Sequence, residues 1–243
     1  MLYGIISDIH SNLEALQSVL VRLEGAVDQI VCLGDIVGYG PNPNECCELL
    51  QKKNIPTVRG NHDSAVCGYL ETKWFNDNAK IAVAINRDLI SSANLDYLRH
   101  LPHVLDFDLF QIVHASLHDY LQEYINNLNV AILNFALMAQ KICFISHTHK
   151  PLVIYEENNA DYGTVPVHGE EDIYLGYYGK VFVNVGSVGQ PRDRDNRAMY
   201  AIYDDIKEEV LIRRVKYDIN ATQVKMQRLN LPQFLIERLP QGK

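Results

Sequence analysis

Five short apolar segments of this chain each end in residues that can bind a metal ion, and this recurrence restricts the fold more than any other feature. The segments are Leu2–Ser7, Gln29–Leu33, Ile55–Val58, Leu109–Val113 and Ile142–Ile145. Their length and composition are typical of buried strands. Because the carboxyl ends of parallel strands lie along one edge of a sheet, where α/β folds bind ligands, we expect the polar residues to gather in one crevice.

Helical patterns separate the first three of these segments. Residues 11–14 resemble a capping box, and leucines then recur at helical spacing from Leu13 to Leu23, ahead of Gly25. A second helix is predicted over Asn44–Lys53. This βαβαβ order predicts a parallel sheet that is covered by helices.

The rest of the chain divides into a helical stretch and a β-rich stretch. The predicted helices are Ala79–Ile90, Asn94–Leu101, Gln122–Ala139 and, late in the chain, Ala221–Leu229. After Lys150 the predicted strands are Leu152–Tyr155, Lys180–Val185, Met199–Tyr203 and Val210–Val215, of which the last two form a hairpin. An α/β half followed by a β-rich half predicts two stacked sheets with helices outside. No repeat or Ser/Gly linker divides the chain, so one domain is expected over residues 1–243.

Composition limits the class of partner. Lys and Arg total 22 against 30 Asp and Glu, which gives a net charge of −8. A nucleic-acid-binding protein usually carries a basic surface, so no stable nucleic acid partner is expected. The negative net charge does not exclude a small phosphate ester as a ligand, because the charge of a bound metal can outweigh the electrostatic field of the whole protein. A homo-oligomer is also compatible with this composition.

Cysteine usage and hydropathy indicate the compartment. The five cysteines contain no CxxC pair, which suits a reducing cytosol. The N-terminus lacks a basic region, and Asp8 interrupts its apolar run, unlike a signal peptide. No apolar run approaches the ~18–20 residues that span a bilayer. We therefore expect a cytoplasmic protein without a membrane partner.

The residues after the five strands form a set of motifs with metal-binding chemistry. In chain order they are Asp8-Ile9-His10, Gly34-Asp35, Gly60-Asn61-His62-Asp63, His114 and Ser146-His147-Thr148-His149. Imidazole and carboxylate ligands without thiolate favour Mn, Fe or Zn over Ca or a cysteine-type structural zinc.

In this order and spacing, the motifs resemble those of the calcineurin-like metallophosphoesterases. Residues 34–41 and 184–193 further resemble a subgroup of small single-domain bacterial and archaeal members. The resemblance runs from residue 2 to about residue 215, with departures at Ala115 and Ser146, where many members have glycine. It implies a four-layer α/β/β/α sandwich of two mixed sheets flanked by helices.

The resemblance also implies two divalent transition-metal ions, with Mn²⁺ first and Fe, Ni, Zn or Co as alternatives. It assigns Asp8, His10 and His149 to one ion, Asn61, His114 and His147 to the other, and Asp35 to both. Asp35 would bridge because a carboxylate has two oxygens, and a hydroxide that bridges the ions would be the nucleophile. With two aspartates and a hydroxide, such a site keeps a charge of about +1, which attracts phosphate.

Further roles follow from the same resemblance. His62 would donate a proton to the leaving-group oxygen as the general acid. The sequence leaves open whether Asp63 or Asp35 orients its ring. Asn61 and Arg192 would contact the phosphate oxygens, with Arg59 as a weaker candidate than Arg192.

The function expected is that of a dinuclear metal-dependent phosphoesterase, which hydrolyses phosphodiesters or small phosphomonoesters. The alternatives are a protein Ser/Thr phosphatase and a dinucleoside-polyphosphate hydrolase. Gly38 counts against the phosphatase, because it stands where the G-D-x-x-D-R-G motif of that class has its second Asp. A third alternative, a non-catalytic binding scaffold, is disfavoured by the complete ligand set and by His62.

Two features outside the motifs have open interpretations. The tyrosine-rich segment Glu156–Tyr178 is either an edge hairpin or a lip beside the metal crevice that stacks a base or aryl group. His168 precedes a glycine, as in the His-Gly motif of the resembled family, but it follows the His147-x-His149 motif where the family's comes first. We expect it to lie outside the site.

Overall fold

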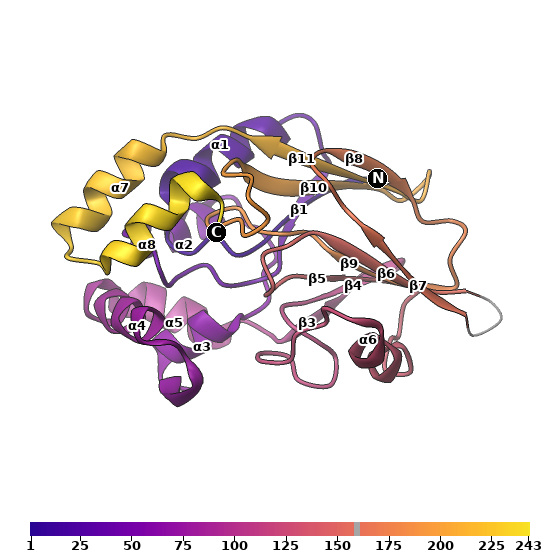
Figure 1. Ribbon diagram of the computed structural model, residues 1–243, viewed down its shortest axis with the longest axis horizontal. Helices are drawn as coiled ribbons and strands as arrows, with labels where there is room; N and C mark the ends of the chain where they lie inside the picture. The colour runs from indigo at the N-terminus through magenta and orange to yellow at the C-terminus, as the bar shows by residue number, and fades with distance from the viewer. Residues whose placement is uncertain (158–160) are drawn as a thin grey trace.

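Two β-sheets pack against each other at the centre of the protein (Figure 1). The computed structural model describes residues 1–157 and 161–243. The first sheet has the order β2-β1-β10-β11-β8 and contains β1 (Leu2–Ile6), β2 (Gln29–Cys32), β8 (Glu171–Tyr174), β10 (Ala198–Asp204) and β11 (Glu209–Val215). The second has the order β3-β4-β5-β9-β6-β7 and contains β3 (Val104–Asp106), β4 (Phe110–Val113), β5 (Ile142–Ile145), β6 (Leu152–Glu156), β7 (Tyr162–Pro166) and β9 (Lys180–Asn184).

Apolar side chains from both sheets form the layer between them. Ile5 and Tyr203 of the first sheet share this cluster with Phe144 and Val183 of the second, and all four are almost completely buried. Each sheet mixes parallel and antiparallel pairs. In the first, β1 is parallel to β2 and antiparallel to β10, and in the second, β9 is parallel to β5 and antiparallel to β6.

Helices cover the outer faces of both sheets. The chain forms α1 (Leu13–Leu23), α2 (Pro43–Lys52), α3 (Asn61–Cys67), α4 (Asp77–Leu89), α5 (Ser92–His100), α6 (Leu128–Phe135), α7 (Ile219–Arg228) and α8 (Gln233–Arg238), with short 3-10 turns at Thr72–Trp74 and Leu239–Gln241. Helix α1 packs on the first sheet and α6 on the second, which places one above and the other below the two sheets in Figure 1. This arrangement confirms the expected α/β/β/α class.

Three expectations about individual elements are wrong. The segment Ile55–Val58 is not a strand and makes one bridge, from Thr57 to Cys32. Pro56 lies inside it and has no N–H for a ladder. The helix expected over Gln122–Ala139 is limited to α6, and the neighbour of β1 opposite β2 is the antiparallel β10, so the first sheet is not parallel.

The segment Glu156–Tyr178 includes residues 158–160, which lie outside the described residues. Its described part supplies β7, which pairs with β6, and then crosses to β8 at the edge of the other sheet. Tyr162 stacks on Phe135, and Tyr178 stacks on Tyr155. These contacts indicate ordinary packing at the sheet edges.

Within the described ranges, none of the helices combines the length and the apolar character that crossing a membrane requires.

Candidate metal centre

The residues expected to bind metal come together at one edge of the sheets. Asp8 and His10 follow β1, Asp35 follows β2, His114 follows β4, His147 and His149 follow β5, and Asn61 begins α3. All seven are at most 6% exposed. The convergence follows from the topology, because β1 and β2 run parallel in one sheet and β4 and β5 run parallel in the other.

Five of these seven residues have a left-handed backbone. The φ angles of Asp8, His10, Asp35, His147 and His149 lie between 48° and 66°. Such angles are uncommon outside glycine and cost of order 1–3 kcal/mol each, so they persist only where the surrounding structure enforces them. Strained residues of this kind gather at functional sites. The backbone thus marks the same edge that the sequence motifs indicate.

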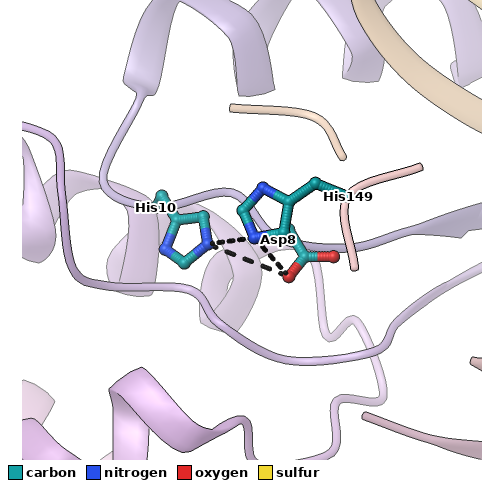
Figure 2. A group of neighbouring side chains, drawn as sticks. All are labelled: Asp8, His10 and His149. Carbon is teal, nitrogen blue, oxygen red and sulfur yellow. Dashed lines mark hydrogen bonds and ion pairs between the residues drawn. The ribbon is translucent and has the colours of Figure 1, made fainter. Parts of the chain in front are cut away.

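Asp8, His10 and His149 form the first cluster (Figure 2). The Nε2 atoms of His10 and His149 are 3.1 Å apart, and Oδ1 of Asp8 lies 3.8 Å from the first and 3.4 Å from the second. Nδ1 of His10 donates to the carbonyl of Val37, and Nδ1 of His149 donates to that of Gln190. A neutral imidazole that donates from Nδ1 carries its lone pair on Nε2. Two lone pairs and a carboxylate oxygen therefore face a common point.

The second cluster contains Asp35, His114 and His147, with Asn61 beside them. Nε2 of His114 lies 3.0 Å from Oδ1 of Asn61 and 3.2 Å from Nδ1 of His147. Nδ1 of His114 donates to the carbonyl of Leu33, so its Nε2 also presents a lone pair. Again, several electron-pair donors converge.

Asp35 connects the two clusters through a single oxygen. Its Oδ2 lies 3.6 Å from Nε2 of His10 and 3.5 Å from Nε2 of His114. Its Oδ1 accepts a hydrogen bond of 2.8 Å from the backbone amide of His62. In this geometry Oδ2 alone faces both clusters, whereas the bridging role expected from the sequence used both oxygens of the carboxylate.

The side chains at this edge fit divalent metal ions. Both carboxylate oxygens of Asp8 and Oδ2 of Asp35 are buried without a hydrogen-bond partner in the described part of the chain, which is costly unless a cation compensates. Burial raises the pKa of Asp8 to about 7 and that of Asp35 well above its usual value. Burial also lowers the pKa of His10 and His149, so these rings are neutral. Neutral imidazoles with carboxylates suit transition-metal ions.

His62 lies beside the first cluster, and one of its ring nitrogens is within 4.8 Å of donor atoms of His10 and Asp35. Its ring packs between Tyr39 and Phe75, at centroid distances of 4.4 Å and 4.9 Å. Its Nδ1 is buried and has no hydrogen-bond partner within residues 1–157 and 161–243, and a Cβ on Gly38 would collide with that atom. Burial lowers the pKa of His62 well below its usual value. Nε2 is therefore the ring nitrogen that is left to face the cavity.

Neither candidate carboxylate orients the His62 ring by a hydrogen bond. Oδ2 of Asp63 accepts from the amide of Gly60, and its Oδ1 accepts from that of Val37. Asp35 binds the His62 amide. Both aspartates therefore hold backbone segments in place, and the ring is positioned by packing.

A cavity of about 180 Å³ opens over the two clusters. Its walls include Asp35, His62 and Arg192 and also four aromatic residues, Tyr39, Trp74, Phe75 and Tyr124. The sequence motifs gave no role to these aromatics. The signals available were that Trp74 is the only tryptophan of the chain and that Tyr39 lies between two glycines shortly after Asp35.

The two candidate arginines differ in position. The guanidinium of Arg192 lies 5.6 Å from the ring centre of Tyr39, and it donates a hydrogen bond of 2.8 Å to Oε1 of Gln190. Arg59 donates to the carbonyl of Arg99 and contacts His103, and it does not line the cavity.

The other candidates outside the motifs lie away from the cavity. None of the described tyrosines of Glu156–Tyr178 lines it, so the lip interpretation finds no support in the described part of that segment. His168 is exposed, and its amide donates to Glu171.

Comparisons with known proteins place this arrangement in context. Residues 1–208 match the family model described as the calcineurin-like phosphoesterase superfamily domain. An uncharacterized protein of Methanocaldococcus jannaschii is 38% identical over 251 aligned residues, which cover 99% of this chain and 98% of that protein. The crystal structure of a metallophosphoesterase from Sphaerobacter thermophilus superposes with a TM-score of 0.89 at 40% identity, covering 100% of this chain and 99% of that one. A hypothetical protein from Pyrococcus horikoshii OT3 shares the fold, with a TM-score of 0.82 at 20% identity and coverage of 100% and 98%.

Proposed function

The chain belongs to the calcineurin-like phosphoesterase superfamily, and on this basis we propose that it hydrolyses phosphodiesters or small phosphomonoesters with two divalent metal ions. The observation that carries the proposal is the position of Asp35. One of its oxygens faces two clusters of electron-pair donors on the floor of an open cavity. A site of this kind suits an in-line displacement at phosphorus, where the attacking and the leaving oxygen both need stabilisation.

The chain offers a complete set of donors for the two ions. Asp8, His10 and His149 would hold one ion, Asn61, His114 and His147 the other, and Oδ2 of Asp35 both. Bound metal ions lower the pKa of a coordinated water and neutralise charge on phosphoryl oxygens. Mn²⁺ is the first candidate, and Fe, Ni, Zn and Co are alternatives.

Two further side chains of the cavity would bind the substrate. Arg192 would contact the phosphate oxygens, since its guanidinium lines the cavity and is held by Gln190. His62 would donate a proton from Nε2 to the departing oxygen, because its Nδ1 is enclosed against Gly38. Burial alone keeps this ring neutral, so the role requires that the negative charge of a bound phosphate ester favours the imidazolium form.

The surroundings of Gly38 favour this function over that of a protein Ser/Thr phosphatase. Gly38 occupies the position of an aspartate in the phosphatase motif, and its φ is +93°. A side chain at this position would collide with the ring of His62. The chain therefore has no room for the additional carboxylate of that motif. We propose a preference for diesters over monoesters, because a site with a charge of only about +1 matches the single negative charge of a diester.

The proposal is tested by measuring the hydrolysis of bis-p-nitrophenyl phosphate and p-nitrophenyl phosphate. The protein is stripped with chelator and reloaded with Mn, Fe, Ni, Zn or Mg. Reloaded protein should hydrolyse the diester faster than the monoester, and stripped protein should hydrolyse neither. A monoester rate more than tenfold above the diester rate would reverse the preference.

Two histidine variants provide a matched comparison. His149→Ala removes a donor of the first cluster, and hydrolysis should fall by at least ~10²-fold. His168→Ala removes an exposed histidine outside the cavity, and the rate should not change. If the fully loaded wild-type protein hydrolyses neither ester, the chain is a binding scaffold and the enzymatic proposal is wrong.

A further inference from the structure

Two exposed aromatic side chains stand at the mouth of the cavity. Nζ of Lys73 lies 5.9 Å from the centre of the Trp74 ring, and Tyr124 stacks on His147. Trp74 is 79% exposed and Tyr124 is 46% exposed, and both line the cavity over the metal clusters. Single exposed apolar residues are common on protein surfaces. Two aromatic residues at the same cavity, next to two candidate metal clusters, are a more specific arrangement.

The ring of Tyr124 is held in place by an imidazole of the second cluster. It lies nearly parallel to the imidazole of His147, with an interplanar angle of 15° and a centroid distance of 4.1 Å. One face of the ring is thus covered by a residue of the second cluster. Tyr124 also lines the cavity, and 46% of its surface is exposed to solvent.

Trp74 is anchored by its neighbour in the chain. Phe75 packs on His62 at a centroid distance of 4.9 Å, which fixes this segment against the floor of the cavity. The indole of Trp74 therefore stays near the mouth although most of its own surface is in water.

Amide side chains add hydrogen-bonding groups to the same walls. Asn76 and Gln122 both line the cavity. Oδ1 of Asn76 accepts from the amide of Ala79, so its NH₂ group remains free to donate. Amides of this kind pair with the edges of nucleobases, and aromatic rings stack on their faces. A plain aryl group would use the rings but not the amides.

We infer that the mouth of the cavity is a subsite for the nucleobase of a nucleotide ester, with Trp74 and Tyr124 as its stacking residues. The inference rests on the proposed function for the position of the phosphate, which would lie at Arg192 and the metal clusters. The base would then extend from the phosphate toward the aromatic mouth.

The test compares two ligands that carry the same phosphate group, adenosine 5′-monophosphate and ribose 5-phosphate. Calorimetry on protein loaded with Zn²⁺ gives both affinities, and the emission of Trp74, the single tryptophan, reports on contact at the mouth. The nucleotide should bind about tenfold more tightly or better, since stacking accounts for a gain of this order, and it should quench the emission. Ribose 5-phosphate should leave the emission unchanged.

Variants locate the base. Trp74→Ala should abolish the advantage of the nucleotide and leave the affinity for ribose 5-phosphate unchanged, whereas Trp74→Phe should keep the advantage. Tyr177→Ala is the matched control, because Tyr177 is 78% exposed and lies outside the cavity. Affinities within twofold of each other would overturn the inference, as would an advantage that survives Trp74→Ala. Failure of the enzymatic proposal would appear separately, as absent hydrolysis of the p-nitrophenyl esters.

Discussion

The Nε2 atoms of His10 and His149 lie 3.1 Å apart, and each ring donates from its other nitrogen to a backbone carbonyl. Two lone pairs at this distance repel each other unless a cation lies near both. Oδ1 of Asp8 points to the same place and has no hydrogen-bond donor among the described residues. These three atoms therefore form a group that a bound divalent cation would stabilise.

Replacing Asp35 with asparagine should weaken both metal sites. Its Oδ2 faces both clusters, and an amide nitrogen in that place has no lone pair to offer. The remaining oxygen can still accept from the His62 amide, so the backbone should keep its place. Elemental analysis of Asp35→Asn after reloading should show that both ions are depleted. Loss of only one ion would contradict the shared oxygen.

His62→Ala should separate proton donation from metal binding. The contact from His62 to Asp35 uses the backbone amide, which the variant retains, so both metals should stay bound. General acid catalysis contributes ~10²–10⁴-fold, but p-nitrophenolate leaves well without a proton. Hydrolysis rates should fall at least tenfold more with an alkyl or nucleoside leaving group than with p-nitrophenyl esters. An equal loss on both kinds of ester would reject the general-acid role.

Gly38→Ala should displace the imidazole ring of His62. The φ of +93° disfavours alanine, and the new methyl group would collide with Nδ1 of His62. The free energy of unfolding should fall by about 1–3 kcal/mol in urea titrations. The hydrolysis rate of esters with poor leaving groups should also fall. Introduced into the His62→Ala variant, Gly38→Ala should lower this rate much less than it does in the wild-type protein. Additive losses would show that Gly38 acts independently of His62.

Asp8 should make the stability of the metal-free protein depend on pH. Burial raises its pKa from 3.8 to about 7. Its protonated form is therefore the one that the fold tolerates, so this contribution to stability is full below pH 3.8 and is lost as the pH rises to about 7. Asp8→Asn removes the effect. In chelator, the free energy of unfolding of the variant relative to wild type should increase by roughly 2–3 kcal/mol between pH 5 and pH 8.

The metal-loaded protein provides the control for this measurement. With ions bound, the positive charge of the metal compensates the negative charge of the Asp8 carboxylate. Metal-loaded Asp8→Asn should therefore be less stable than the metal-loaded wild-type protein at pH 8. A variant that behaves in the same way with and without metal would show that Asp8 does not face the ions.

The sequence predicted that the candidate metal-binding residues gather at one edge, because most of them follow strands, and strand ends in an α/β fold meet at one edge. It could not show the backbone carbonyls of Val37, Leu33 and Gln190 that fix the imidazole rings, because carbonyls carry no side-chain signal. It also could not show that one oxygen of Asp35 serves both clusters, since this depends on the amide of His62.

The sequence predicted the fold less well where strands that are far apart in the chain pair with each other. The strand β10 lies next to β1 although almost 200 residues separate them in the chain, and a local pattern cannot specify such a neighbour. Helix α3 was not predicted because its seven residues are all buried and lack a periodic polar face. Short, fully buried helices of this kind owe their formation to tertiary packing.

The number of metal ions that each chain binds tests the dinuclear centre most directly. Protein that has been stripped, reloaded with Mn²⁺ at neutral pH and freed of excess metal should contain close to two equivalents by elemental analysis, as two donor clusters with a shared oxygen require. Less than one equivalent under these conditions would contradict the dinuclear centre.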